Sequence, residues 1–292
     1  MADDWIRIAN GTLSAAINPL GAELSSLTDA AGRELMTDAD PRFWTGRAPL
    51  LFPVVGMTAS GAIKVDGVSY PIAKHGFARR SVFSVIETSP ARAVFALTDD
   101  QATRAAYPFA FRLEVAFELR DATLGIEVTV VNPADAPLPA SFGFHPAFAW
   151  PLPYGQDRAA HRIAFEKNEP GALKVIAADG TIAATERLSP LDGPVLHLAD
   201  DLFADDALVW DPVASQSVIY GVEGAPQLHI AFPDTPKLGI WTKPGAAYVC
   251  VEPWHGIADP EGFDGEYRDK PGVFEVPAHG EQRITMSITL LD

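Results

Sequence analysis

The sequence predicts an all-β protein, a large antiparallel sandwich or barrel with few short helices. Three observations indicate this fold class: apolar and polar residues often alternate with a period of two, helical periodicity is scarce, and 25 prolines and 23 glycines interrupt the chain at short intervals. Period-two alternation places apolar side chains on one face of a strand, and Pro and Gly favour tight turns between strands. With 292 residues, 48% of them hydrophobic, the chain is long enough to bury a sizeable core.

Two hairpins are the clearest elements. Residues 111–119 alternate almost perfectly, and a turn at Asp121 and Ala122 separates them from a second strand at residues 124–131. Residues 63–65 and 68–70 flank an Asp-Gly pair, which is the strongest short hairpin signal. Further strands are expected at residues 12–17, 82–87, 93–98, 217–221, 227–232, 238–242, 248–252 and 283–290.

The remaining segments are less regular. We expect one short helical turn over residues 99–106, ended by Pro108, and long loops over residues 151–194. The sequence contains no evident internal repeat, low-complexity tract or linker, so residues 1–292 are predicted to form a single domain.

The chain is acidic, with a formal net charge of −16 at pH 7 and a pI of about 4.7. Phosphate backbones and anionic lipids repel such a charge, so neither nucleic acid nor a membrane surface is an expected partner. The first residues contain no basic segment followed by an apolar run, and no stretch approaches 18 apolar residues. We therefore expect a soluble cytoplasmic protein; export after removal of a leader that this sequence does not show is the alternative.

The single cysteine, Cys250, allows neither an intramolecular disulfide nor a thiolate metal cluster. The histidines show no ligand spacing such as HExxH or His-x-His, and the acidic loop at residues 259–266 lacks the order of an EF-hand. We therefore expect no metal site. Cys250 is interpreted as a small core residue rather than a nucleophile.

Three short islands each place a titratable side chain beside residues that interrupt regular structure. Residues 74–79 contain His75, residues 143–148 contain His145, and residues 251–256 contain Glu252. A proton-shuttling enzyme needs an acid and a base that face each other across a substrate, and His and Glu are readily tuned for that work near neutral pH. The aromatic and small residues around them are typical of a sugar-sized pocket.

The third island continues a predicted strand. Alternation over residues 248–252 places Tyr248, Cys250 and Glu252 on one face, so Glu252 is expected to point into a concavity. Pro253 holds Glu252 in an extended backbone and is expected to end the ladder there. The alternative is an ordinary edge-strand glutamate in water.

The two histidine islands each have a second interpretation. Gly143 leaves open space beside His145, and Pro146 biases His145 to an extended backbone; a half-buried histidine bonded to the main chain is the alternative. Beside His75, Gly76 permits a close approach or a positive φ. For His75 the alternative is a basic surface turn.

Four other residues are weaker candidates. Arg47 is a cation inside an apolar run and needs a partner, either a structural ion pair or a ligand. Arg79 offers a rigid fork of donors that suits sugar hydroxyls or a carboxylate. Asp205 and Asp206 form either a solvated turn or a hydroxyl acceptor.

Taken together, these islands resemble the aldose 1-epimerase (galactose mutarotase-like) superfamily, and most closely its LacX-like branch. The likeness covers most of the chain and depends on the order and spacing of six segments, at residues 18–24, 47–53, 74–79, 143–148, 251–256 and 270–272. The resemblance implies a β-supersandwich. It also implies an enzyme that interconverts the α and β anomers of a free aldose, a monosaccharide substrate, and no cofactor. It leaves the choice between a monomer and a homodimer open.

The resemblance also implies roles for individual residues. His145 matches the general acid that protonates the ring oxygen, Glu252 matches the general base that takes the proton from the C1 hydroxyl, and His75 matches a second histidine near the ring oxygen. Arg47, Arg79 and Asp206 match substrate-binding positions, with Asp205 aligning almost as well as Asp206. Trp254, just past the end of the predicted strand, is a further expected contact to the sugar, on its position rather than on the resemblance.

Three other functions stay open at this point. The first is a non-catalytic carbohydrate-binding or regulatory module on the same fold. The second is a hexose-phosphate mutarotase, in which Arg47, Lys74 and Arg79 meet the phosphate, although the Arg-Gly-Gly pattern of that branch is missing. The third is a glycoside hydrolase or lyase that uses Glu252 with Asp206 as paired carboxylates.

Overall fold

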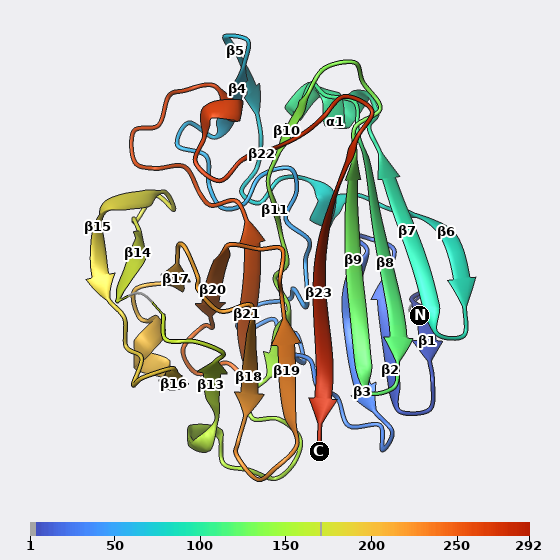
Figure 1. The fold of residues 1–292 in the computed structure, drawn as a ribbon, viewed down its shortest axis with the longest axis vertical. Helices are drawn as coiled ribbons and strands as arrows, with labels where there is room; N and C mark the ends of the chain where they lie inside the picture. The colour runs from blue at the N-terminus through green and yellow to red at the C-terminus, as the bar shows by residue number, and fades with distance from the viewer. Residues whose placement is uncertain (1–3, 170) are drawn as a thin grey trace.

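The computed structural model describes residues 4–169 and 171–292, and antiparallel strands dominate it (Figure 1). Within these residues the largest sheet has nine strands, and β23 runs through its middle. In spatial order its strands are β16 (Val195–His197), β13 (Arg162–Phe165), β18 (Ser217–Gly221), β19 (Gln227–Ala231), β23 (Glu281–Leu291), β9 (Thr123–Val131), β8 (Arg112–Arg120), β7 (Arg92–Thr98) and β6 (Ser84–Ser89).

A second sheet of seven strands, again among the described residues, carries the candidate site. Its strands are β11 (Phe142–Gly143), β21 (Tyr248–His255), β20 (Lys237–Trp241), β17 (Leu208–Trp210), β14 (Ala172–Ile176) and β15 (Ile182–Leu188), with β12 (Ala147–Ala149) also pairing with β21. Smaller sheets are formed by β1 (Ile6–Ala9), β2 (Leu13–Asn18) and β3 (Glu23–Asp29), by β4 (Ala62–Val65) and β5 (Val68–Pro71), and by β10 (Leu138–Ala140) and β22 (Phe274–Val276).

The core lies between the sheets. Along β8 the side chains are alternately buried and partly exposed, so Val115 and Phe117 face inward. They belong to one buried cluster that also contains Leu27 of β3 and Val249 and Val251 of β21. Each sheet thus covers the apolar face of another, which is how antiparallel sheets bury a core. The predicted all-β antiparallel fold class is confirmed.

Both predicted hairpins are present. Strands β8 and β9 pair in antiparallel register, with Arg120 opposite Thr123. Strands β4 and β5 pair across a two-residue turn in which Asp66 has a φ of 50° and Gly67 a φ of 77°. A type I′ turn requires a positive φ at both central residues. Asp and Gly tolerate this conformation, which is why the Asp-Gly pair predicts the hairpin.

The short helical turn is also confirmed. Helix α1 (Gln101–Ala106) begins after Asp100, whose carboxylate accepts a hydrogen bond from the Thr103 backbone N–H. Single turns of 3₁₀-helix occur at Ala78–Arg80, Arg158–Ala160, Asp200–Phe203 and Tyr267–Asp269. None of the helices in the described part of the chain has the length or the apolar surface to cross a membrane.

Two local predictions were wrong. Residues 151–194 contain strands β13, β14 and β15 rather than long loops alone. Strand β21 does not end at Pro253 but continues to His255. Proline removes one N–H from the ladder, yet the Pro253 carbonyl still accepts a hydrogen bond from the Phe144 N–H at 3.0 Å, so pairing resumes beyond it.

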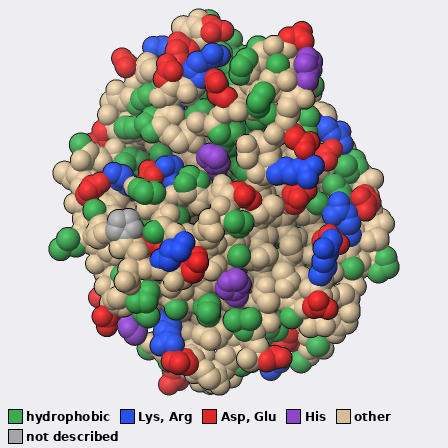
Figure 2. Space-filling view, in the orientation of Figure 1, with side chains coloured by type: hydrophobic (Ala, Val, Ile, Leu, Met, Phe, Trp, Pro, Cys, Tyr) green, Lys and Arg blue, Asp and Glu red, His purple; other side chains and the backbone are tan. Residues whose placement is uncertain are grey.

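Charged groups of both signs are mixed on the face shown in Figure 2, where Asp and Glu side chains lie among Lys and Arg side chains. Nucleic-acid binding generally requires a continuous basic patch or stripe that follows the phosphate backbone. The mixed pattern on this face, together with the net charge of −16, does not match that requirement.

Candidate active site

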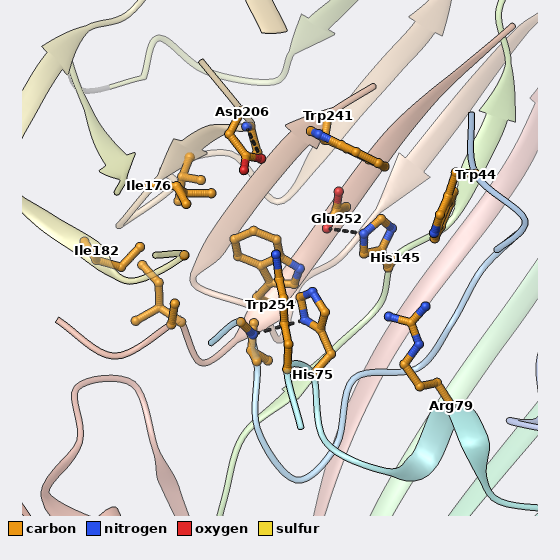
Figure 3. A pocket seen from close by; sticks show the side chains of 18 residues that line it. Trp44, His75, Arg79, His145, Ile176, Ile182, Asp206, Trp241, Glu252 and Trp254 are labelled. Carbon is orange, nitrogen blue, oxygen red and sulfur yellow. Dashed lines mark hydrogen bonds and ion pairs between the residues drawn. The ribbon is translucent and has the colours of Figure 1, made fainter. Parts of the chain in front are cut away.

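A cavity of about 270 Å³ opens above β20 and β21, and loops from the N-terminal half of the chain close its sides (Figure 3). Of the seven side chains predicted to contact substrate, six line this cavity: His75, Arg79, His145, Asp206, Glu252 and Trp254. They come from segments that lie up to 179 residues apart in the sequence, between His75 and Trp254. The fold therefore brings the three islands to one hollow.

His145 and Glu252 face each other because of strand register. On one side of the pair, Phe142 of β11 lies opposite His255 of β21. On the other side, Ala147 of β12 lies opposite Cys250. Extending either antiparallel register places residue 145 directly opposite residue 252. The His145 Nε2 and the Glu252 Oε2 are 3.2 Å apart, and both side chains are more than 90% buried.

Burial shifts the protonation of this pair. It lowers the pKa of His145 to about 3, assisted by the positive charge of Arg79. It raises the pKa of Glu252 well above its ordinary value, assisted by the negative charge of Asp206. Both shifts favour the form of the pair in which one shared proton lies on the carboxyl group. The carboxylate–imidazolium form has the same number of protons and is reached by one transfer over the 3.2 Å contact.

The tautomer of His75 is fixed by the backbone. The Gly56 N–H donates to His75 Nδ1 at 3.1 Å, and the His75 N–H donates to the Gly56 carbonyl at 2.9 Å. Burial and the nearby His145 keep the pKa of His75 well below its ordinary value, so the ring is neutral. A neutral ring that accepts at Nδ1 carries its proton on Nε2. His75 therefore presents an N–H donor to the cavity, whose wall it forms.

His75 also has a φ of 65°, which is the left-handed region that non-glycine residues rarely adopt. The following Gly76 has a φ of 70°, and a Cβ there would lie 2.1 Å from the Phe52 carbonyl oxygen. The chain can therefore make this turn only with glycine at residue 76, as the sequence suggested. The two hydrogen bonds to Gly56 hold His75 in this conformation.

Trp254 forms the floor of the cavity beside Glu252 (Figure 3). Its indole lies between two glycines of the neighbouring strands: a Cβ at Gly143 would be 2.6 Å from its Cδ1, and a Cβ at Gly239 would be 2.6 Å from its Cη2. Strands β11 and β20 thus leave a slot that only glycine provides. An aromatic floor of this kind suits the apolar face of a ring-shaped ligand.

Arg79 and Asp206 approach the cavity from different loops. Arg79 lies in the 3₁₀ turn Ala78–Arg80, and its side chain points toward His145 in Figure 3. Among the described residues it makes no ion pair, and burial lowers the pKa of its guanidinium. Asp206 precedes β17, has a φ of 72°, and lines the cavity, whereas Asp205 does not. The structure thus places the second aspartate of the pair at the site.

A family model described as aldose 1-epimerase matches residues 4–270. The chain belongs to the aldose 1-epimerase family. Protein LacX (chromosomal) of Lactococcus lactis subsp. lactis is 28% identical, over 98% of this chain and 99% of that protein.

Two solved structures share the fold closely. A galactose mutarotase related enzyme from Lactobacillus acidophilus has a TM-score of 0.91 and 30% identity, covering 99% of this chain and 97% of the other. A galactose mutarotase-like protein from Lactobacillus casei has a TM-score of 0.91 and 26% identity, covering 98% of this chain and 100% of the other. The chain therefore has the galactose mutarotase-like fold.

Arg47 is the one predicted substrate contact that does not line the cavity. Its guanidinium Nη1 donates to the Thr37 carbonyl at 2.7 Å, and its backbone N–H donates to the Glu23 carboxylate at 2.8 Å. The predicted sugar contact is thus replaced by a structural role: Arg47 holds the loop that carries Trp44. A cation in an apolar run requires a polar partner, and for the Arg47 guanidinium this partner is the backbone carbonyl of Thr37.

Two aromatic residues were missed from the sequence. Trp44 stacks on His145, with ring centroids 4.9 Å apart and an interplanar angle of 35°. Trp241 meets the same imidazole edge-on, at 5.9 Å and 82°. Aromatic faces favour a neighbouring cation, so Trp44 stabilises the imidazolium form against the cost of burial. The indole of Trp44 also closes over Gly46, where a Cβ would lie 2.3 Å from its ring.

Ile176 and Ile182 were also missed, because they belong to the β14–β15 hairpin in the segment expected to form loops. They line the cavity, as do Val209 and Ile257. Figure 3 shows Ile176 and Ile182 away from His145 and Glu252. The cavity therefore has a polar end at His145 and Glu252 and an apolar end under the hairpin.

Substitution of Gly239 tests whether the position of the Trp254 indole matters for activity. Gly239→Ala places a methyl group 2.6 Å from Trp254 Cη2, so the indole must move. We expect kcat/KM to fall about 10- to 100-fold, because small displacements of positioning groups have effects of that size. The matched control is Gly125→Ala in β9, where the nearest atom is 3.7 Å away; its sugar exchange rate is expected to stay unchanged. Equal effects of the two changes would contradict the role of Trp254.

Proposed function

We propose that this chain is an aldose 1-epimerase that interconverts the α and β anomers of a free aldose. The observation that supports this most directly is the contact of 3.2 Å between His145 Nε2 and Glu252 Oε2 at the wall of a cavity. Anomer exchange needs one group that removes the O1 proton and another that protonates O5. Both oxygens are bonded to C1, so the two catalytic groups must lie close together, as these do.

The reaction follows from the proton count of the pair. In the carboxylate–imidazolium form, Glu252 takes the proton of the O1 hydroxyl while His145 gives its proton to O5, and the C1–O5 bond breaks. The pair then has the proton on the carboxyl group, which is the form that burial favours. Rotation about the C1–C2 bond and the reverse transfers close the ring as the other anomer. Only protons move, and none is gained or lost.

The other cavity residues bind and orient the sugar. His75 donates from Nε2 to the ring oxygen or a neighbouring hydroxyl, and Arg79 donates to hydroxyls on the same side. Asp206, at the exposed mouth, accepts from a hydroxyl. Trp254 supports the apolar face of the ring. None of these contacts requires a cofactor.

A direct experiment is polarimetry on freshly dissolved α-anomers of a panel of hexoses and pentoses. We expect the protein to accelerate the approach to anomeric equilibrium for at least one neutral aldose. If it binds sugars and leaves every exchange at the buffer rate, the chain is a carbohydrate-binding module rather than an epimerase. Release of reducing ends from oligosaccharides would instead support a glycoside hydrolase.

One observation favours a second candidate substrate. Lys74 and Arg79 are both cations that line the cavity, and among the described residues neither makes an ion pair. A sugar phosphate would gain two charged contacts there. If so, glucose 6-phosphate should show a higher kcat/KM than glucose, and Lys74→Gln should reduce that preference. An unchanged ratio in the Lys74→Gln variant would favour neutral sugars.

The pH profile is a further test of the paired acid and base. A free imidazole titrates near pH 6.5, but burial lowers the pKa of His145 to about 3. Because the pair keeps one proton until a second is added to His145, kcat/KM is expected to stay level as the pH falls from about 7 to about 5. Stopped-flow polarimetry in inert buffers measures this. An acid limb centred near pH 6.5 would contradict the shared-proton interpretation.

A further inference from the structure

Cys250 lies beside the acid–base pair, and the proposed reaction does not use its thiol. It is two residues from Glu252 on β21, so both side chains share one face of the strand. It also lies opposite Ala147, two residues beyond His145. The potential ligand atoms of His145, Cys250 and Glu252 all lie within 4.8 Å of one another, and all three residues are buried. No sequence spacing shows this grouping, because His145 comes from a distant segment.

The spacing of these atoms is close to that of a zinc site. Zinc binds imidazole nitrogen at about 2.0–2.1 Å, thiolate sulfur at about 2.3 Å and carboxylate oxygen at about 2.0–2.2 Å, in a tetrahedron. Those lengths separate neighbouring ligand atoms by about 3.3–3.7 Å. His145 Nε2 and Glu252 Oε2 are already 3.2 Å apart. Closing the widest separation, 4.8 Å at most, takes side-chain movements of about 1 Å.

We propose that His145, Cys250 and Glu252 form an inhibitory site for a thiophilic divalent cation, and that Zn²⁺ is the ion it fits. One nitrogen, one sulfur and one oxygen ligand suit zinc, whereas Mg²⁺ and Ca²⁺ prefer sets of oxygen ligands. Three protein ligands leave a fourth position for water or another small ligand on the cavity side.

The orientation of the three side chains is compatible with metal binding. Metals bind the neutral form of imidazole, and Nε2 of His145 is the nitrogen that faces Glu252. Nδ1 of His145 has no hydrogen-bond partner among the described residues. Zinc binds cysteine as the thiolate and glutamate as the carboxylate, so the two negative charges of Cys250 and Glu252 would balance the charge of the dication.

Because an ion reaches this site through the cavity, the metal and the sugar cannot bind at the same time. His145 and Glu252 line the cavity, whereas Cys250 packs behind them in a cluster with Ala147 and Tyr248. An ion therefore enters through the cavity and occupies the acid and the base at once. Inhibition is competitive with the sugar and is reversed by a chelator. This consequence rests on the proposed epimerase function; the metal binding itself does not.

The test uses the full chain and two metals. Zn²⁺ is titrated by calorimetry, and Cd²⁺ is titrated by the ultraviolet charge-transfer absorption of a cadmium–thiolate bond, to which the one cysteine of the chain is the sole contributor. We expect one ion per chain at this site and a rise in apparent KM that EDTA reverses. Cys250→Ser is expected to keep the anomer exchange rate and to weaken zinc binding by at least about tenfold.

The outcomes separate this proposal from the proposed function. A Cys250→Ser chain that is inhibited by zinc as strongly as the unmodified chain overturns the proposal, and so does the absence of a cadmium–thiolate band. A clear band in a protein that does not accelerate anomer exchange supports the metal site and refutes the epimerase. If the serine variant has a lowered melting temperature, Cys250→Ala can replace it in the same zinc and cadmium titrations, because alanine keeps the buried side chain apolar. Binding at surface histidines is the same in every variant and is subtracted.

Discussion

Replacing Glu252 by Gln is expected to lower kcat for anomer exchange by about 10²- to 10⁴-fold, the usual contribution of one positioned base. The amide keeps the size of the side chain and its place opposite His145, but it cannot take the O1 proton. Sugar binding is expected to change much less than kcat, because Arg79, Asp206 and Trp254 remain in the cavity. Stopped-flow polarimetry gives both parameters, and the melting temperature shows whether the fold is intact.

The matched control is Glu127→Gln in β9. Glu127 also alternates with buried strand residues, but its side chain is exposed on the other large sheet. This variant makes the same carboxyl-to-amide replacement as Glu252→Gln and is expected to keep the full exchange rate. If Glu252→Gln were as fast as Glu127→Gln, Glu252 would not be the base, and the proposed reaction would fail with it.

Replacing His145 by Asn is the second large effect, again a loss of about 10²- to 10⁴-fold in kcat. Asparagine cannot protonate O5, and it also removes the ring on which Trp44 stacks at 4.9 Å. The matched control is His197→Asn, at an exposed position in β16, which is expected to leave kcat for anomer exchange unchanged.

The double variant shows whether the two residues act as a unit. Because one proton passes between His145 and Glu252, either single change disables the transfer. The His145→Asn, Glu252→Gln chain is therefore expected to be little slower than either single variant. Losses that multiply fully in the double variant would mean that the two side chains act in independent steps.

Much of the fold could be predicted because its signals are local. Alternation over residues 111–119 identifies a strand with one buried face, and the Asp66-Gly67 pair identifies a type I′ turn from its two residues alone. The hairpin β14–β15 was missed because its strands carry little alternation. In β15 most side chains are at least partly exposed, so no buried face marks the segment as a strand.

The site was harder to predict, because it depends on register between distant segments. The islands indicated that His145 and Glu252 are candidates, but nothing in the sequence shows that residue 145 lies opposite residue 252. The same limit hid Trp44 and the nearness of Cys250 to the pair. Arg47 was a reasonable candidate because it is a cation in an apolar run, yet backbone carbonyls, which no side-chain pattern reveals, bind its guanidinium.

The central claim is that one sugar ring presents its anomeric centre to the paired imidazole and carboxyl groups. A crystal structure of the Glu252→Gln chain with a bound aldose measures this directly. The account predicts O1 within about 2.6–3.2 Å of the residue 252 side chain and O5 at a similar distance from His145. A sugar whose reducing carbon instead points toward Ile176 and Ile182, with neither oxygen near the pair, would contradict it.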